Sequence, residues 1–248
     1  MLQIIPFRQP QLKVPTFSVD QKLSPELDEY ELLSNMNKSF ACAIIGRAGS
    51  GKTSLLHGLL NTKGVFKKVF HQIFVFMPSN SRSSMSNCIF NKLPDDQIHD
   101  HLNLETLNIV FAEVEDNAKN KKNSLIVFDD VQQFFKGECE DQLLHMVNNR
   151  RHNRLSMFFI AQSYKKIPRK IRLALSDMFV FKLSKDDMED IYTELAEIDA
   201  SLYLQILEMF KELQRDKNTK HFMYLHVPTQ RFFIDWDEVK TEHEATST

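Results

Sequence analysis

The chain has 248 residues, of which 42% are hydrophobic and 26% charged, and its net charge of −2 is ordinary for one sizeable globular domain. Its longest continuous apolar run, FACAII at 40–45, is too short to cross a bilayer, and its first residues show no signal-peptide pattern. The three cysteines are isolated in the sequence, which predicts reduced thiols in an intracellular protein and argues against a zinc site.

Apolar segments alternate with helical ones along the chain. After a polar, proline-rich start with one short helix capped by Ser24, we predict strands at 39–45, 72–77, 107–111, 124–128, 156–161 and 178–182. Helices are predicted at 52–60, 92–100, 131–149, 168–176, 186–196 and 200–215, and a β-hairpin at 221–226 and 231–235. Because the strand segments are apolar throughout, we expect a mostly parallel sheet covered by helices on both faces. The sequence thus predicts an α/β fold with an N-terminal extension at 1–38, one compact domain at 39–236 and a flexible tail at 237–248.

A phosphate-binding loop is predicted at 46–53, where GRAGSGKT matches the pattern GxxxxGK[ST] between a strand and an apolar helix. Its glycines allow successive backbone N–H groups to point at phosphate oxygens, at the positive end of a helix. Lys52 is expected to reach the β- and γ-phosphates of ATP, and the Thr53 hydroxyl to coordinate Mg²⁺. A chance glycine-rich turn is the alternative, but three of the six glycines of the chain lie here. The predicted nucleotide-binding residues are Gly46, Arg47, Ala48, Gly49, Ser50, Gly51, Lys52, Thr53 and Ser54.

Two adjacent carboxylates, Asp129 and Asp130, follow the apolar segment 124–128 at the expected carboxyl end of a strand, where open α/β sheets bind ligands. Asp129 is expected to hold Mg²⁺ opposite Thr53, directly or through water, and Asp130 to orient or deprotonate an attacking water. A pair of turn or helix caps is the alternative. The strands between this pair and the phosphate loop favour the P-loop class that has an additional strand between its two motifs.

Gln162 ends the apolar segment 156–161, which in this class is the strand inserted between those of the two motifs. A polar side chain at this position can hydrogen-bond the γ-phosphate and the lytic water, and can sense which nucleotide is bound. The alternative is an amide that caps the following turn.

A basic stretch without acids surrounds this strand. Between Gln142 and Ser176 there is no Asp or Glu but eight Lys and Arg, whereas 185–216 has ten acids and three bases. The first stretch is suited to meet anions, and the second to meet water or a basic partner. With a solvated helix face as the alternative, the predicted DNA contacts are Lys165, Lys166, Arg169, Lys170 and Arg172.

Four segments resemble the genome-packaging ATPases of large DNA viruses and their satellites, within the FtsK–HerA superfamily. They are SFACAIIGRAGSGKTSLLHGLL, LIVFDDV, NNRRHNRLSMFFIAQSYKKIPRKIR and SDMFVFKLS, which lie within 38–185. Among the poxvirus, giant-virus and virophage types, the short chain is most similar to the virophage type. The resemblance maps the family's phosphate loop, tandem acids and strand-end glutamine onto 46–53, Asp129–Asp130 and Gln162.

The resemblance implies a homo-oligomeric ring that hydrolyses ATP with Mg²⁺ and drives double-stranded DNA into a preformed capsid, docked on capsid protein at a packaging vertex. It implies a place in the cytoplasmic viral factory or on the virion, and contacts to the DNA backbone without sequence specificity. It also implies that the arginine-rich segment 150–154 faces a neighbouring subunit, with Arg151, or else Arg150 or Arg154, acting on the neighbour's nucleotide. A helix-end arginine that complements the helix macrodipole is the alternative.

Three other functions share parts of this pattern. A helicase or DNA-segregation translocase of the same superfamily would have the same chemical core. A P-loop nucleoside or nucleotide kinase would need a lid and a base-binding pocket, and the paired acids with a strand-end glutamine fit it poorly. The complete set of Lys52, Thr53, Asp129 and Asp130 argues against a non-hydrolysing scaffold of capsid assembly.

Overall fold

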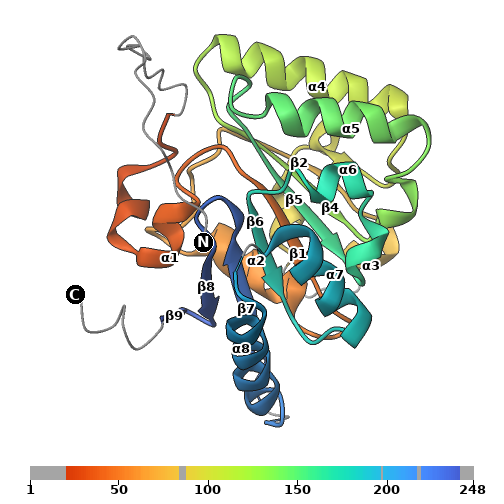
Figure 1. The fold of residues 1–248 in the computed structure, drawn as a ribbon. Helices are drawn as coiled ribbons and strands as arrows, with labels where there is room; N and C mark the ends of the chain where they lie inside the picture. Colours follow the sequence, from red (N-terminus) through yellow and green to blue (C-terminus); the bar gives the residue numbers. More distant parts are fainter. Residues whose placement is uncertain (1–20, 84–87, 197, 217–218, 241–248) are drawn as a thin grey trace, which may run out of the picture.

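A central sheet runs through the computed structural model, which describes residues 21–83, 88–196, 198–216 and 219–240 (Figure 1). Its strand order is β3-β2-β4-β5-β1-β6-β7-β8-β9. The pairs from β3 to β6 are parallel, and β7, β8 and β9 extend the sheet as an antiparallel ribbon. The strands are β1 (Ala41–Ile45), β2 (Gln72–Phe76), β3 (Ile98–His99), β4 (Ser124–Asp129), β5 (Leu155–Ala161), β6 (Asp177–Val180), β7 (Met223–His226), β8 (Arg231–Ile234) and β9 (Asp237–Val239).

Helices connect the parallel strands, as in the right-handed β–helix–β connections typical of such sheets. The α-helices are α1 (Glu31–Asn35), α2 (Lys52–Asn61), α3 (Ser79–Ser83), α4 (Leu104–Lys119), α5 (Glu138–Asn149), α6 (Arg169–Arg172), α7 (Lys185–Leu195) and α8 (Ala200–Leu213). The 3₁₀ helices are η1 (Pro25–Glu29), η2 (Ile89–Lys92), η3 (Asp95–Gln97), η4 (Gln132–Phe134), η5 (Tyr164–Lys166) and η6 (Val227–Thr229).

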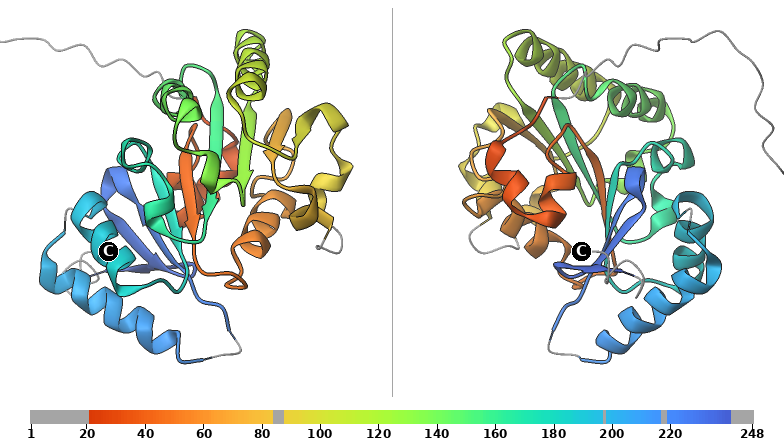
Figure 2. Two further views of the ribbon diagram at one scale, coloured as in Figure 1. Left: turned by 90° about the vertical axis from the view of Figure 1, so that its right-hand side faces the viewer. Right: turned by 60° about the vertical axis from the view of Figure 1, so that its left-hand side comes forward.

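Each face of the sheet has its own hydrophobic core, because successive side chains of a strand point to opposite faces. In β1, Ala41, Ala43 and Ile45 belong to the cluster formed with helices α4 to α8. Cys42 and Ile44 belong to the cluster formed with η1, α1 and α2. Figure 2 shows these helices on the two sides of the sheet. The predicted α/β fold, with a parallel sheet covered on both faces and a C-terminal hairpin, is confirmed.

The order β4-β5-β1 places β5 between the strand of the phosphate loop and the strand of the paired acids, as predicted. The three strands are parallel, so the residues that follow them lie at the same edge of the sheet. This edge is where the candidate site is found.

Two predicted elements are wrong. The segment 107–111, predicted as a strand, lies inside α4, whose buried residues Leu107, Val110, Phe111 and Val114 have the spacing of one helix face. The segment LNIVF is too short to show this helical spacing. The segment 92–100, predicted as a helix, contains the end of η2, then η3 and β3, because Pro94 lacks the N–H that a helix interior needs.

The helix predicted at 131–149 begins later than expected. The segment 131–149 contains η4 and a turn at Gly137, whose φ of 78° suits glycine, and α5 begins only at Glu138.

Residues beyond both predicted ends of the domain pack against its core or pair with its sheet. Leu27 and Leu33, within the expected N-terminal extension, are buried in the same cluster as the leucines of α2. After Trp236, where we expected a tail, Asp237–Val239 pair with β8 as β9. The predictions for 1–20 and 241–248 lie outside the described residues. Within the described ranges, no helix is long and apolar enough to span a membrane.

Candidate active site

The phosphate loop lies between β1 and α2, as predicted. A Cβ on Gly46 would lie 2.6 Å from the Cβ of Phe181 and from Ser50 Oγ, so only glycine fits there. Gly51, at the start of α2, has a φ of 108°, which side-chain-bearing residues rarely adopt. The sequence pattern therefore reflects two backbone requirements of this loop.

Lys52 is anchored to the loop itself. Its Nζ donates to the carbonyl oxygens of Gly46 (2.7 Å) and Arg47 (2.9 Å). Burial lowers the pKa of Lys52, and the charges of Asp129 and Asp130 oppose this shift. The ammonium group is thus held against the loop whose backbone N–H groups would meet a phosphate chain.

Asp129 and Thr53 meet across the site. The Thr53 hydroxyl donates to Asp129 Oδ2 over 3.3 Å, and Asp129 is only 7% exposed. Burial raises the pKa of Asp129 to about 6, and the charge of Asp130 adds to the rise, while Thr53 and Lys52 act in the opposite direction. A carboxylate whose ionised form is disfavoured in this way gains from a nearby cation.

The same pair fits a magnesium ion. Both side chains offer oxygen donors, which Mg²⁺ prefers, and proteins commonly hold this ion with one or two carboxylates and the phosphates of the substrate. In the described part of the chain, no group of three or more His, Cys, Asp and Glu side chains is placed to hold a metal.

Asp130 has a neighbour that the sequence did not indicate. The Ser81 hydroxyl, from α3, donates to Asp130 Oδ2 over 3.1 Å. Asp130 has a φ of 59°, a sparsely populated conformation for a non-glycine residue. Asp130 lines the cavity, where the Ser81 hydrogen bond holds its carboxylate.

Gln162 lies where β5 ends. Its backbone N–H donates to Gln132 Oε1 over 2.9 Å, which ties the end of β5 to the segment after the paired acids. Its side chain is exposed and lines the same cavity as Lys52 and Asp130. The cavity has a volume of about 590 Å³, and the predicted site residues that line it are Gly49, Lys52, Thr53, Ser54, Asp129, Asp130 and Gln162.

The prediction that Arg172 contacts DNA is wrong, because this residue is only 8% exposed. Its guanidinium donates to both oxygens of Glu194 on α7 (2.8 and 2.9 Å) and lies 4.5 Å from the centre of the Tyr164 ring. Removing one partner of such a buried pair leaves an uncompensated charge, so Arg172 holds α6 against α7.

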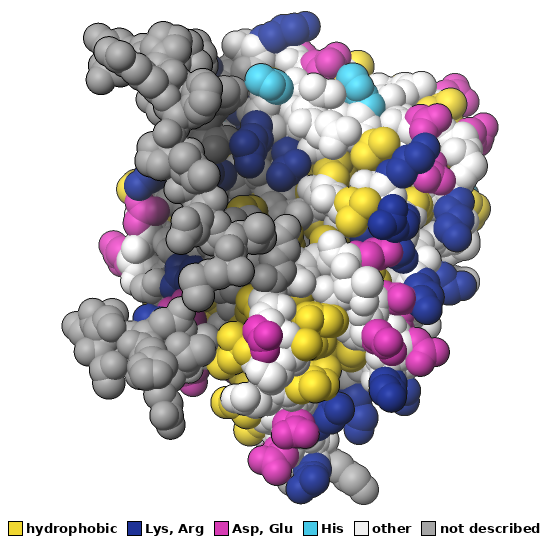
Figure 3. Space-filling model, in the orientation of Figure 1, with side chains coloured by type: hydrophobic (Ala, Val, Ile, Leu, Met, Phe, Trp, Pro, Cys, Tyr) yellow, Lys and Arg dark blue, Asp and Glu magenta, His cyan; other side chains and the backbone are white. Residues whose placement is uncertain are grey.

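The acidic helix α7 also neutralises part of the remaining basic segment. Lysines, arginines and carboxylates accordingly alternate over this side of the molecule (Figure 3). In the described ranges, Lys166 is exposed and forms no ion pair. The other three candidates are paired, Lys165 with Asp190 (2.9 Å), Arg169 with Glu194 (3.3 Å) and Lys170 with Asp141 (3.6 Å).

The arginine-rich segment lies at the opposite edge of the sheet, because it precedes β5 whereas Gln162 follows it. At about 3.3 Å per residue, the seven residues of β5 separate the two by roughly 20 Å. Arg150 donates to the carbonyl of Val147 (2.8 Å), and Arg154 to that of Lys121 (2.9 Å). Arg151 is the exposed arginine of the three.

Besides Ser81, three residues near the cavity were missed by the sequence analysis. His57 lines the cavity, and burial lowers the pKa of its imidazole. Gln132 follows the paired acids, in a segment for which the sequence analysis predicts a helix and no role in the site. Lys220 lies against the phosphate loop, since a Cβ on Gly51 would be 3.1 Å from its side chain.

The fold and this site define the chain as a P-loop ATPase with an additional strand between its two motifs. The chain belongs to the Poxvirus A32 protein family, whose model matches residues 28–234. The virophage type stays a prediction. A comparison with the curated proteins gives no match.

Solved structures share the fold at low identity. The genome packaging NTPase B204 from Sulfolobus turreted icosahedral virus 2, in complex with AMP, is 15% identical with a TM-score of 0.56 and covers 81% of this chain and 98% of its own. Its complex with ATP-γS gives 15% identity, a TM-score of 0.54 and the same coverage. EssC (ATPases 2 and 3) from Geobacillus thermodenitrificans is 13% identical with a TM-score of 0.50, covering 98% of this chain and 50% of its own. At these identities the similarity establishes the fold.

Proposed function

We propose that the chain is the motor that uses ATP hydrolysis to move double-stranded viral DNA into a preformed capsid. The observation that carries the proposal is the meeting of Lys52, Thr53, Asp129, Asp130 and Gln162 at one edge of the sheet, around a single cavity. Family membership supports the viral role, as does the fold shared with B204, a genome packaging NTPase. The motor would act as a homo-oligomeric ring at a capsid vertex, in the host-cell cytoplasm or on the virion.

The chain's own side chains divide the chemistry. Lys52 and the backbone N–H groups of the phosphate loop would hold the phosphates and neutralise charge that develops on them. Thr53 and Asp129 would hold Mg²⁺, which when bound supplies positive charge to the phosphate oxygens. Asp130, positioned by Ser81, would take the proton of the attacking water, and Gln162 would orient that water.

Asp129 and Asp130 should separate in function. Asp130→Asn keeps the size of the side chain and its acceptor for Ser81 but removes the base, so hydrolysis should fall by about 10²–10⁴-fold while Mg–ATP still binds. Asp129→Asn should weaken the binding of Mg–ATP as well, because it removes a charged ligand. Calorimetric titration and phosphate release measure the two effects. Equal Mg–ATP affinity and parental turnover in both variants would contradict the division of roles.

Lys166 is the basic residue of this segment most available to DNA. Lys166→Glu should reduce DNA-stimulated hydrolysis and lower the salt dependence of DNA binding, by a slope change of about one per lost contact. Reversal of Lys165, Arg169 or Lys170 should reduce stimulation less, because each already pairs with an acid of its own subunit. Lys67→Glu, an exposed charge reversal in the turn before β2, is the control. Equal loss of basal and stimulated rates in Lys166→Glu would place this lysine at the nucleotide instead.

The test of the whole proposal measures ATP hydrolysis with and without linear duplex DNA, and the mass of the assembly in the same sample. A DNA-stimulated rate in an oligomer is expected. A nucleoside or nucleotide kinase would ignore DNA and require a small acceptor, and a scaffold would show no turnover. A helicase or segregation translocase would also respond to DNA, and packaging into purified empty capsids separates it from the motor proposed here.

A further inference from the structure

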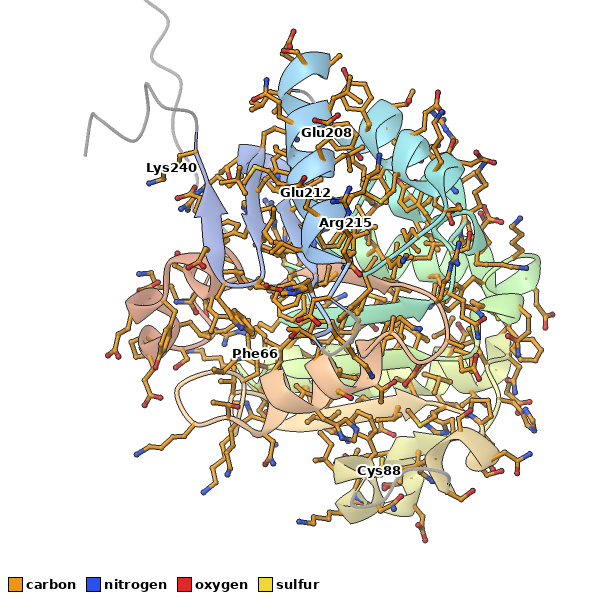
Figure 4. The ribbon with its side chains drawn as sticks, turned by 90° about the horizontal axis from the view of Figure 1, so that it is seen from below. Phe66, Cys88, Glu208, Glu212, Arg215 and Lys240 are labelled. Carbon is orange, nitrogen blue, oxygen red and sulfur yellow. The ribbon has the colours of Figure 1, made fainter. Side chains whose placement is uncertain are left out.

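A second cavity, of about 670 Å³, lies beside the phosphate loop. Three segments that are distant in sequence form it: the junction of η1 and α1 at Tyr30, one side of α2, and the β8–β9 turn at Trp236. Figure 4 views the molecule from below and shows α1 beside α2, with the strands that end near Lys240 close to α1. Its volume is within the usual range for a small-molecule site.

Ser54 connects the two cavities, because it lines both. It follows Thr53 in the first turn of α2, where the phosphate loop ends. The first cavity contains the charged groups Lys52, Asp129 and Asp130, whereas the second is formed largely by leucine and aromatic side chains of α1, α2 and the hairpin turn. The pair of cavities has the polarity of a nucleotide, which is charged at the phosphates and aromatic at the base.

Gly58 leaves space in the second cavity. It lies in the interior of α2, where glycine destabilises a helix relative to alanine. A Cβ built on Gly58 meets no atom within 4 Å, so neither packing nor backbone conformation requires glycine here. The missing side chain instead leaves the cavity open along the side of the helix that continues from Ser54.

Two aromatic rings border the cavity and are exposed. Tyr30 is 48% and Trp236 is 54% exposed, so both rings have free surface at the edge of the cavity. The Trp236 ring contacts the edge of Phe222 (centroids 5.2 Å apart). The turn that carries it is fixed by Asp235, which accepts hydrogen bonds from the Phe222 N–H (3.0 Å) and pairs with His221 (2.7 Å). Trp236 is therefore presented by a structured turn.

We propose that this second cavity holds the ribose and nucleobase of the bound nucleoside triphosphate, with the base against Trp236 and Tyr30. The inference rests on the proposed function, because it extends the same site. The phosphates occupy the cavity of Lys52 and Asp129, and the sugar passes Ser54 to enter the second cavity. Because the lining is mostly apolar, the base is held by contact area and stacking more than by hydrogen bonds.

Trp236 makes the proposal directly testable, since it is the only tryptophan of the chain. The full-length chain is titrated with the non-hydrolysable analogue AMP-PCP and, separately, with inorganic tripolyphosphate, both with Mg²⁺. AMP-PCP should change the Trp236 emission in a saturable manner. Tripolyphosphate, which has no base, should bind at the phosphate loop without that change.

Gly58→Leu fills the cavity without a clash in the helix and should lower the affinity for AMP-PCP by roughly ten- to hundredfold, the range expected for one stacked base. Its affinity for tripolyphosphate should stay at the parental value, which also shows that the variant is folded. Tyr30→Ala should weaken AMP-PCP in the same selective way. Asn61→Leu adds the same side chain to an exposed position of α2 outside the cavity and is the matched control.

Two results would overturn the proposal while leaving the ATPase intact. One is an unchanged Trp236 emission at AMP-PCP concentrations that saturate the chain by calorimetry, with parental affinity in Gly58→Leu. The other is an emission that follows protein concentration and not nucleotide, which would assign the cavity to a second copy of the chain. If neither probe bound the parent chain, the proposed function itself would be wrong, and this inference with it.

Discussion

Lys52→Ala should abolish ATP hydrolysis in a chain that remains folded. The Lys52 ammonium donates to carbonyl oxygens of its own loop, and Lys52 belongs to neither hydrophobic core, so its removal opens no cavity in them. Its positive charge, however, would be lost from the γ-phosphate at the point where negative charge develops. Loss of one such group typically costs about 10²–10³-fold in rate, and weakened phosphate binding adds to it. Phosphate release measures the loss, and thermal unfolding shows that the fold is retained.

Lys63→Ala is a suitable control, because Lys63 is exposed just beyond the end of α2 and lines neither cavity. It should hydrolyse ATP as the parent chain does. Parental hydrolysis by a folded Lys52→Ala variant would contradict the role given to the phosphate loop, and the assignment of Thr53 and Asp129 as metal-holding residues would fail with it.

The sequence predicts the placement of site residues best where chemistry and backbone geometry are contiguous in the chain. GRAGSGKT specifies its own conformation, since Gly46 and Gly51 are needed for packing and for a positive φ. Asp129 and Gln162 each end an apolar strand, and parallel strands bring such ends to one edge. The central strand order was expected from the P-loop class that has an additional strand between its two motifs.

What the sequence did not predict depends on contacts between distant segments. Ser81 reaches Asp130 because β2 pairs with β4, which places α3, the helix after β2, beside the residue after β4. Charge counted along the chain suggested that Arg172 faces DNA, but α7 returns across α6 and buries it against Glu194.

The misassigned strand at 107–111 has a similar cause. A five-residue apolar window fits a strand and a buried helix equally well. The Asn103 side chain caps α4 by accepting from the Thr106 N–H, and the register of the buried residues continues to Val114. A longer window that includes this cap would have favoured the helix.

Arg151 should act on the nucleotide of a neighbouring subunit in the ring. It is exposed at the edge of the sheet opposite the cavity, so it cannot reach the phosphates of its own subunit. Across an interface, its guanidinium could direct several donors at the γ-phosphate, and such arginines contribute about 10³–10⁵-fold in rate in other P-loop enzymes. Arg150 and Arg154 are only partly exposed, whereas Arg151 is exposed, which makes Arg151 the stronger candidate. Arg151→Ala should therefore lower hydrolysis by a comparable factor, whereas loss of a charge at a helix end would cost only about 0.3–1 kcal/mol of stability.

The decisive measurement mixes two inactive variants. Lys52→Ala subunits keep Arg151, and Arg151→Ala subunits keep an intact phosphate loop, so a mixed ring contains interfaces with one working copy of each. Hydrolysis should recover in the mixture and follow the proportion of such interfaces as the ratio of subunits is varied. A mixture of Lys52→Ala with the double variant Lys52→Ala, Arg151→Ala is the control and should stay inactive, because it contains no intact phosphate loop. Mass measurement must show that the rings are mixed. If they are and no activity returns, Arg151 serves its own subunit, and its role is that of a helix-end charge.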